Sequence, residues 1–545
     1  MESSLTATDI LHEQEKQEND RLPWIRLWNE VAWLLDPKYV NTFSSYSIKT
    51  EGRENSERQF DATASLSRDR GAAAIHNLLT PDLQKWHRYR ALDLQQNKQA
   101  ANLRYFDDVR DTVFRYRYAP TANFIAQIAE HWSMLLTYGN SVMFCDRLDG
   151  GGLRYKLIHI GEVTFAENHQ GIVDTVHRRF KMSARQALQK FRDDCPDKVK
   201  EYAIDSKRMY EKFTFVHCVK PRPDYDPTRG DYKGMKFASY YVCVEEQKIV
   251  SEGGYRTMPY IVSRYSVSPS SSYSRSPVIS VLPSIRVLNE QKKTVLKAGQ
   301  RSVDPVLLAH DDGVIGTISL RPGYTNYGAV DNQGRKLVHT LDMGNLPIGK
   351  ELMDDERLVI KDALFVTLFQ ILTENPQMTA TEVLERIREK GILLSPLGRQ
   401  NEALSLLNMR ELDLLQSQGL LPQMPMTLAK DGGWDAHVVY DSPLSRAMQA
   451  EEASGFMRTL ETAVNLSQAT QDPSALDWLD IDTAMPEIAD IQAVPARWIR
   501  TADQVQELRQ GRQQQQAMQQ MADAAPAISS IFKTTGTAAT ARAGA

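Results

Sequence analysis

The sequence predicts an α+β fold that is mainly helical. Three features lead to this prediction: apolar residues at helical spacing near the N-terminus, short β-rich runs between residues 139 and 265, and a β insertion between two long helices at 279–372. At 545 residues the chain is too long for a single core. We therefore expect about two to four compact regions.

The N-terminal residues 6–80 are predicted to be helical. Pro23 is expected to begin one amphipathic helix, and "DPK" at 36–38 is expected to end it. A second helix is expected near 56–79, and two more within 98–138, separated by Pro120. The apolar face of the first helix consists of Trp24, Leu27, Trp28, Val31 and Leu35.

Residues 139–265 contain the β-rich runs. "SVMFCDRL", "GLRYKLIHI", "GIVDTVHRRF" and "FTFVHCV" carry β-branched and aromatic residues, and turns rich in Gly, Asp or Asn separate them. A short helix near 183–193 is expected to interrupt the strands. The stretch "SPSSSYSRSP" at 268–277 is rich in serine and proline, so we interpret it as a linker that marks a boundary.

A long helix is predicted at about 279–301, and one of its sides is basic. At about 1.5 Å per residue it spans roughly 33 Å. A rotation of about 100° per residue places apolar residues on one side and cations roughly opposite. The apolar residues are Val281, Ile285, Leu288 and Val295. The cations, which we call the basic row, are Arg286, Lys293, Lys297 and Arg301.

The residues after this helix alternate between strand and helix signals. Strand-and-turn patterns occupy 303–341, and a second helix is expected at about 350–372. The loop "TENPQM" then leads to a third helix at 380–418, which Gly391 and Pro396 should kink or split. Later helices are expected at 443–470 and 501–521. The final residues are small and polar, and we expect them to be mobile.

Charge and cysteine content exclude some classes of protein. The net charge is −4 and the isoelectric point is about 6.3. A protein that clamps DNA over its whole surface should be strongly basic, so only weak or transient DNA contact stays open. The four cysteines form no C-x-x-C pair, which predicts reduced, mostly buried thiols in an intracellular product. No secretion signal is recognised at the N-terminus. The apolar run 358–372 has two charges and predicts a buried helix, not a membrane span.

The segment "GNLPIGKEL" at 344–352 approaches the phosphate-binding pattern G-x-x-x-x-G-K-[ST]. Both glycines and Lys350 match, but Glu351 replaces the hydroxyl residue, and Pro347 lacks a backbone N–H. We interpret the segment as a turn before a helix with an acidic first turn, which the helix dipole favours. The acids are Asp354, Asp355 and Glu356.

Two further polar features leave alternatives open. The basic row has the spacing to meet passing phosphates, but it also has the spacing to pair with Asp354, Asp355 and Glu356 on a neighbouring helix. The loop residues Glu374, Asn375 and Gln377 either reach a cavity or form an ordinary surface turn. The carboxylates between 477 and 490 either hold a divalent cation or form an acidic surface or subunit contact, and we prefer the latter.

Several segments occur in the order expected for one family. They are "LLTPDLQKWHRYRAL" at 78–92, "YGNSVMF" at 138–144, "RSPVISVLPSIRVLNEQ" at 275–291, "RPG" at 321–323, "NPQMTATEV" at 375–383 and "SPLSRA" at 442–447. The M-T-A-T-E-V run is the most specific. Over roughly residues 10–510 the chain resembles the portal, or head-to-tail connector, proteins of short-tailed double-stranded DNA bacteriophages.

The resemblance implies a portal-type ring subunit with named regions. These are an N-terminal wing region at 1–265, a linker and first stem helix at 266–302, a clip insertion at 303–345, a second stem helix at 346–372, a tunnel loop at 373–379, wing and crown helices at 380–498, a C-terminal crown or barrel helix at 499–522 and a flexible tail at 523–545. Because "TENPQM" has no Lys or Arg, a basic ring on the tunnel loop is doubtful, and the stem cations are the better candidates.

The resemblance also implies a structural role without catalysis, cofactor or metal. The expected assembly is a homo-oligomeric, dodecameric ring at one capsid vertex that conducts viral double-stranded DNA, independently of its sequence, during packaging and ejection. The expected partners are the large terminase subunit, tail adaptor proteins, and capsid and scaffolding proteins, with no membrane. The ring would assemble in the host cytoplasm and stay in the virion at the head–tail junction. The DNA-channel candidates are Arg286, Lys293, Lys297, Arg301, Glu374, Asn375 and Gln377.

Two other functions compete with this interpretation. The first is an NTP-driven DNA-packaging ATPase, for which the near-match at Gly344–Lys350 is the motivation. Alternatively, the chain is another structural component of a phage, such as a capsid or tail-adaptor subunit. DNA-stimulated ATP hydrolysis would distinguish the first alternative from a portal, and copy number per virion would distinguish the second.

Overall fold

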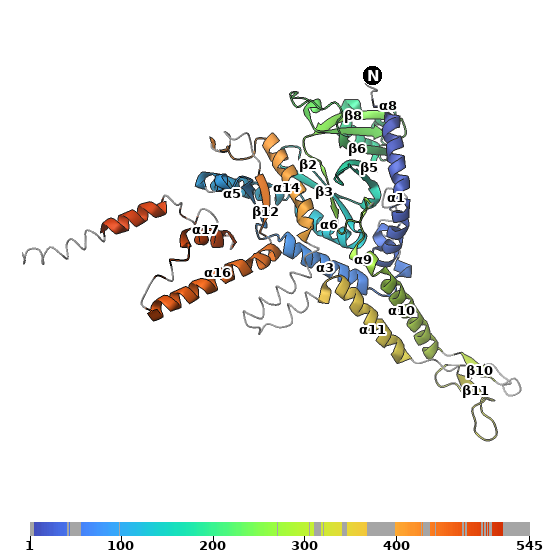
Figure 1. Cartoon of the computed structure of the whole chain (residues 1–545). Coiled ribbons are helices and arrows are strands. Elements are labelled where there is room, and N and C mark those ends of the chain that lie inside the picture. The colour runs from blue at the N-terminus through green and yellow to red at the C-terminus, as the bar shows by residue number, and fades with distance from the viewer. Residues whose placement is uncertain are drawn as a thin grey trace, which may run out of the picture. The chain divides into compact units, whose positions relative to one another are not determined.

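A computed structural model (Figure 1) describes residues 5–40, 43, 56–97, 99–269, 271–304, 306–309, 318–319, 321–340, 346–367, 398–426, 428, 436–441, 443–470, 474, 477–491, 494, 498, 500 and 504–515. The chain divides into two compact units, each described by itself. The first comprises Met1–Trp86, Val113–Leu421 and Ser442–Leu444. The second comprises His87–Thr112, Pro422–Asp441 and Ser445–Ala545.

The N-terminal helix, α1 (Ala7–Leu35), is longer than predicted. It begins at a capping box in which the side chain of Thr6 accepts from Asp9 N and Asp9 accepts from Thr6 N. Pro23 lies inside α1, so the prediction that this proline begins the helix was wrong. The helix continues through Pro23 because residues on both sides of it are buried against the first unit, including Ile10 and Trp28.

Other predicted helices of the first unit are present with changed bounds. The helix expected near 56–79 is α3 (Thr63–Leu79), preceded by the 3₁₀ turn η2 (Ser56–Arg58). The helix after Pro120 is α6 (Phe124–Tyr138). The helix expected near 183–193 is α7 (Ala184–Phe191), and α8 (Asp197–Ile204) was not predicted. The remaining 3₁₀ turns are η1 (Pro37–Tyr39), η3 (Ile160–Glu162), η4 (Arg192–Asp194) and η5 (Tyr232–Gly234).

Two antiparallel sheets confirm the β-rich region. The three-stranded sheet has the order β3-β2-β9, formed by β2 (Asn140–Arg147), β3 (Leu153–Ile158) and β9 (Tyr260–Arg264). The five-stranded sheet has the order β4-β5-β6-β7-β8. Its strands are β4 (Val163–Glu167), β5 (Val173–Ser183), β6 (Lys212–Pro221), β7 (Phe237–Cys243) and β8 (Lys248–Tyr255). Consecutive strands of this second sheet pair in sequence order, so it is a meander.

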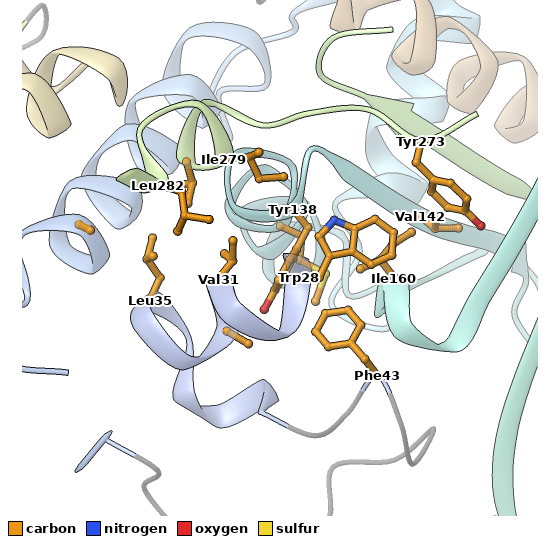
Figure 2. Close-up of a cluster of buried hydrophobic side chains, with 14 of the residues drawn as sticks. Trp28, Val31, Leu35, Phe43, Tyr138, Val142, Ile160, Tyr273, Ile279 and Leu282 are labelled. Carbon is orange, nitrogen blue, oxygen red and sulfur yellow. The ribbon is translucent and has the colours of Figure 1, made fainter. Parts of the chain in front are cut away.

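A large buried cluster, which we call the main cluster, joins α1 to the sheets and to the base of α10 (Figure 2). Trp28 packs against Phe43 with ring centroids 5.8 Å apart and against the edge of Tyr273 at 5.5 Å. Ile279 and Leu282 enter the same cluster. Of the apolar face predicted for α1, Trp28, Val31 and Leu35 are buried, while Trp24 and Leu27 pack against the cluster from its rim.

The C-terminal end of the predicted serine-rich linker (268–277) is held by hydrogen bonds from the region of the "YGN" motif at 138–140. Gly139 has φ +77°, and a Cβ there would lie 2.5 Å from Ser274 O. Asn140 donates to Ser274 O at 3.1 Å and accepts from Ser274 N at 3.0 Å, and Ser276 Oγ donates to Thr137 O at 2.9 Å. Ser276 also caps α9 (Pro277–Ser280). Two motifs far apart in sequence therefore form one junction, from which α10 departs.

The helix–insertion–helix layout is present in the first unit. α10 (Leu282–Val303) leads away from the sheets to the hairpin of β10 (Leu307–Ala309) and β11 (Val338–Thr340), and α11 (Leu346–Ala363) returns beside α10 (Figure 1). The two helices are antiparallel and packed together.

The second helix of this pair ends earlier than predicted. A helix to residue 372 was expected, but α11 ends at Ala363 and a turn follows at Leu364 and Phe365. Val366 and Thr367 are helical again, and 368–372 lie outside the described residues. Phe365 has φ 63°, in the left-handed region. Leu364 is buried, and its carbonyl oxygen would lie 2.6 Å from a Cβ added at Gly71 of α3. The end of α11 is therefore a place where the chain packs closely against α3. The first unit also contains α14 (Gln400–Ser417).

The second unit contains a strand pair that the sequence did not predict. β1 (His87–Ala91) pairs antiparallel with β12 (Ala436–Tyr440), and Arg88 forms an ion pair with Asp441 at 2.8 Å. Its helices are α4 (Leu94–Asn97), α5 (Ala100–Arg117), which continues into the first unit, α16 (Pro443–Thr470), α17 (Ile481–Ile491) and residues 504–515. α16 matches its predicted bounds, and Asp482 of the acidic segment pairs with Arg509.

Two predictions about side chains and membranes were tested. All four cysteines, Cys145, Cys195, Cys218 and Cys243, are free and buried, as predicted. Burial raises the pKa of the Cys218 thiol to about 12, which keeps it protonated and unreactive. Among the described helices, none combines the length and apolar character needed to cross a bilayer.

Candidate functional site

The α10–α11 pair carries four of the seven predicted site residues. The apolar side of α10 faces the interior as expected: Ile285 and Leu288 are buried, and Val295 packs at the edge of the cluster. The basic row lies on the other side, where Arg286, Lys297 and Arg301 are exposed and Lys293 is half-buried. The sequence thus predicted correctly which side of the helix is charged.

The basic row is not paired with the acids predicted for it. Arg286 instead forms a two-point ion pair with Glu30 of α1, with one contact of 2.6 Å between Nη2 and Oε2. Lys293 contacts Glu290 of its own helix at 3.3 Å. In the described part of the chain, neither Lys297 nor Arg301 has an ion pair. Within the described residues of one chain, the basic row therefore forms none of the pairs expected with Asp354, Asp355 and Glu356.

The acids of α11 are also placed differently from the prediction. α11 begins at Leu346, so Asp354, Asp355 and Glu356 lie in the middle of the helix and not in its first turn. Asp354 pairs with Arg357 at 2.8 Å, and Arg357 also contacts Asp61 at 2.7 Å. The helix starts early because Pro347 is well tolerated in a first turn, where its missing N–H would have no partner.

The near-match to a phosphate-binding loop is largely helical. Leu346, Pro347 and Ile348 belong to α11, whereas a phosphate loop needs these positions in an open turn whose N–H groups converge. Gly349 has a packing role, because a Cβ there would lie 3.3 Å from Val295 Cγ2 of α10. Gly344 lies outside the described residues.

The three other predicted site residues, Glu374, Asn375 and Gln377, lie outside the described residues. The elements on either side of them are anchored in the first unit. Val366, before the segment, is buried in the main cluster, and Gln400, after it, donates to Arg264 O at 2.9 Å. Their predicted place in a DNA channel stays a prediction.

The comparisons with known proteins decide the family. The family model described as "Bacteriophage head to tail connecting protein" matches residues 7–500 of this chain. The chain belongs to this connector family. A protein named probable portal protein, from Bordetella phage BPP-1, is 26% identical over 507 residues, covering 90% of this chain and 88% of that protein. The portal protein of Salmonella phage epsilon15 is 25% identical over 520 residues, covering 92% and 90%.

A buried polar network in this connector-family chain was missed by the sequence analysis. Arg117 at the end of α5 and Glu411 of α14 form an ion pair in which both side chains are fully buried. Arg117 Nε donates to Glu411 Oε1 at 3.1 Å, and the hydroxyl of Tyr155 donates to the same oxygen at 2.6 Å. Burial and the adjacent Glu411 charge raise the pKa of Tyr155 well above its usual value, so the hydroxyl remains a donor.

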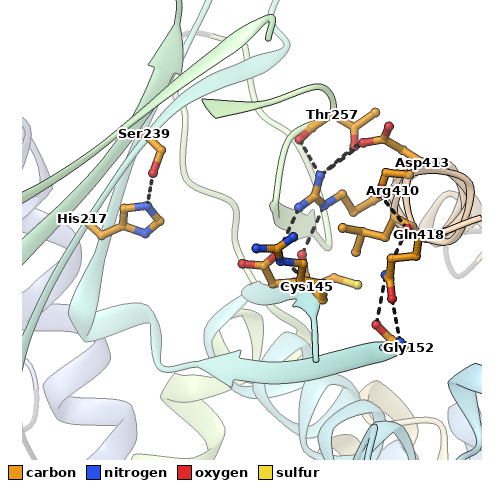
Figure 3. A network of polar contacts seen from close by, with 12 residues as sticks. Cys145, Gly152, His217, Ser239, Thr257, Arg410, Asp413 and Gln418 are labelled. Carbon is orange, nitrogen blue, oxygen red and sulfur yellow. Dashed lines mark hydrogen bonds and ion pairs between the residues drawn. The ribbon is translucent and has the colours of Figure 1, made fainter. Parts of the chain in front are cut away.

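A second part of the network fixes α14 to the three-stranded sheet (Figure 3). Arg410 donates to Cys145 O at 3.2 Å and to Thr257 Oγ1 at 3.1 Å, and it lies 3.3 Å from Asp413 Oδ2. Gln418 accepts from Gly152 N at 2.7 Å. Contacts such as Arg117 to Glu411 join residues 294 apart in sequence, so no local pattern signals them.

The tip of the connector-family chain, which we define as the described residues of 306–340, exposes apolar side chains. Tyr327 is 87% exposed and Tyr324 is 59% exposed. Val306, Leu308 and Val330 are also exposed. Tyrosines are enriched at protein interfaces, where an apolar ring and a hydroxyl are both used. The pattern of 303–341 predicted strands and turns, but not this surface.

Proposed function

We propose that this chain is a portal protein. It forms a ring at one capsid vertex, at the head–tail junction of the virion, and conducts double-stranded DNA during packaging and ejection. The observation that carries the proposal is the family match over residues 7–500. Two relatives are named as portal proteins, one of them as a probable one. The layout of α10, hairpin and α11 supports it, because a paired rod with a small tip suits side-by-side packing around an axis.

The proposed ring does not hydrolyse ATP itself. Energy for packaging comes from a separate partner, the large terminase subunit, as the family resemblance implies. The alternative of an ATPase rested on the near-match at Gly344–Lys350. The helical conformation of Leu346–Ile348 argues against a phosphate-binding loop there. The purified ring should therefore show no DNA-stimulated ATPase activity, and hydrolysis abolished by Lys350→Ala would restore the alternative.

Transport through the ring requires weak contact with DNA. Affinity for phosphate grows with each cation that contacts it, so a densely basic channel would hold the DNA in place. The net charge of −4 agrees with this requirement. Arg286 is already engaged by Glu30, so the basic row has few cations left with which it could hold DNA tightly.

The tip is the proposed docking site for terminase and later for a tail adaptor. Its exposed tyrosines supply the surface for this contact. The variant Tyr324→Ser/Tyr327→Ser should form normal rings but lose binding of the large terminase subunit in a pull-down experiment. The matched control is Tyr210→Ser/Tyr225→Ser, which removes two exposed tyrosines elsewhere. Equal binding by both variants would reject the tip as the docking site.

The proposed function is tested by imaging and by counting. Electron microscopy and native mass spectrometry of the purified protein should show a ring of about twelve subunits with a central opening. Quantitative mass spectrometry of virions should find about a dozen copies. A protein that remains monomeric at micromolar concentration, or hundreds of copies per virion, would contradict the portal assignment and favour another structural role.

A further inference from the structure

The outer faces of α10 and α11 carry opposite charge, and they do not meet within one chain. We propose that they meet between copies: the basic row of α10 in one subunit packs against the α11 acids of its neighbour. This inference rests on the proposed ring, and it assigns the basic row to the contact between subunits instead of to DNA.

The acids involved form what we call the acidic row, consisting of Glu351, Asp355 and Asp362. A rotation of about 100° per residue places these three within about 40° of one another on α11. They lie roughly opposite Gly349, the residue by which α11 touches Val295 of α10. All three are exposed, and so is Leu358 beside them, with 54% exposure.

The basic row occupies the equivalent position on α10. Measured from Val295, the same rotation places its four residues roughly on the opposite side of the helix. Each row therefore points away from the contact between the two helices. A single subunit has a basic face on the outside of α10 and an acidic face on the outside of α11, and the geometry prevents these faces from pairing within the chain.

The contacts within one chain leave both rows largely unsatisfied. Among the described residues, no ion pair involves Glu351, Asp355 or Asp362. Lys293 pairs with the exposed Glu290 and lies 5.6 Å from the ring centroid of Phe60. Exposed ion pairs of this kind add little stability. Two different, complementary surfaces on one molecule produce head-to-tail association, which closes into a ring when the rotation between copies is suitable.

The contact between Val295 and Gly349 also predicts which charges meet. Because α10 and α11 are antiparallel, Lys293 and Glu351, each two residues from that contact in opposite chain directions, lie at the same level along the pair. A ring made by rotation alone keeps this level from one copy to the next. Lys293 should therefore face Glu351 of the next subunit, with Lys297 about 6 Å further along.

Charge reversal and restoration test this contact. Lys293→Glu/Lys297→Glu and Glu351→Lys/Asp355→Lys should each reduce ring assembly by at least about tenfold at about 0.1 M salt. The combination of all four substitutions should restore it, because each charge again faces its opposite. The matched control, Lys212→Glu/Lys248→Glu, makes the same charge change on exposed strand residues and should assemble normally. Ring fraction is measured by native mass spectrometry, and folding by circular dichroism.

A cysteine pair tests the same contact without changing the charge pattern strongly. Treated with a bifunctional maleimide, Lys293→Cys/Glu351→Cys should give a ladder of cross-linked copies on a denaturing gel. A cross-linker is needed because the long side chains of a Lys–Glu pair can hold their Cα atoms further apart than the about 7 Å that a disulfide requires. Each single-cysteine variant is the control and should give no ladder. A cross-link within one chain, or no cross-link between copies in assembled rings, would overturn the inference, even where the charge-reversed variants fail to fold.

The outcomes separate this inference from the proposed function. If the unmodified protein forms no ring, the portal proposal fails. If it forms rings and Lys293→Glu/Lys297→Glu assembles as well as the control, only the subunit contact is wrong. If those rings then fail to package DNA, the basic row acts on DNA. Failure of the fourfold variant to recover, with its fold intact, also overturns the pairing.

Discussion

The network around Arg117 and the outer face of α10 use charged residues in opposite ways. Arg117 and Glu411 are completely buried, and Tyr155 and Asn408 share the same cluster, so the charges are compensated within one chain. Lys297 and Arg301 are exposed and, among the described residues, have no ion pair. The first arrangement fixes α14 in place, because a buried charge requires its partner. The second leaves charge available to another molecule.

The largest effect on stability is expected from removing the Glu411 side chain. Glu411→Ala leaves Arg117 buried without its counter-charge, and the expected loss in free energy of unfolding is about 3–5 kcal/mol. The measurement is chemical denaturation followed by tryptophan fluorescence. The control is Glu402→Ala, an exposed acid of the same helix, which should stay within about 0.5 kcal/mol. Equal losses in the free energy of unfolding would mean that the buried ion pair contributes no more to stability than an exposed acid of the same helix.

A pH experiment distinguishes buried polar groups from exposed charge. Burial lowers the pKa of His131 to about 3, whereas an unfolded histidine titrates near 6.5. The unfolded state therefore binds more protons between these values, so the stabilisation is complete above about pH 6.5 and is lost as the pH falls toward about 3. At pH 5 the loss for this histidine is about 2 kcal/mol relative to pH 8.

His131→Gln should reduce the difference in unfolding free energy between pH 8 and pH 5, because the group that titrates at about pH 6.5 in the unfolded state is removed. The variant His169→Gln, which changes an exposed histidine, is the control and should keep the full difference. An unchanged pH dependence in His131→Gln would show that this histidine does not remain neutral in the folded protein.

Substitution of Gly349 tests the α10–α11 contact. A Cβ at this position would lie 3.3 Å from Val295 Cγ2, so Gly349→Leu should overpack the contact and lower the free energy of unfolding by about 1–3 kcal/mol. Gly349→Ala is the matched control, since its gain in helix propensity of about 1 kcal/mol offsets a small steric clash. Equal destabilisation by both variants would argue against a packing role.

The smallest effect is expected at Arg286. Its side chain is 50% exposed and that of Glu30 is 39% exposed, so water and ions screen the pair. Glu30→Gln should lower the free energy of unfolding by less than about 1 kcal/mol, and the difference should vanish at about 1 M salt. A loss that persists at high salt would show that this pair fixes the base of α10 as firmly as Glu411 fixes α14.

The sequence predicted those elements whose signal is local. The apolar face of α1, the strands between 139 and 265, and the opposite sides of α10 follow from side-chain periodicity, which depends only on neighbours along the chain. The errors have tertiary causes. Pro23 stays within α1 because packing on both sides supports the helix, and α11 breaks at Leu364, where α3 approaches closely. The β1–β12 pair joins residues too distant for local patterns to connect.

The sequence by itself determined the mainly helical α+β class, the charged side of α10 and the order of motifs that marks the connector family, because all of these are properties of spacing along one chain. Only the tertiary structure decided what the charges contact. It paired Arg286 with Glu30, buried Arg117 against Glu411, and directed the basic and acidic rows away from each other. The physical reason is that an ion pair depends on distance in space, and the packing of Gly349 against Val295 sets that distance.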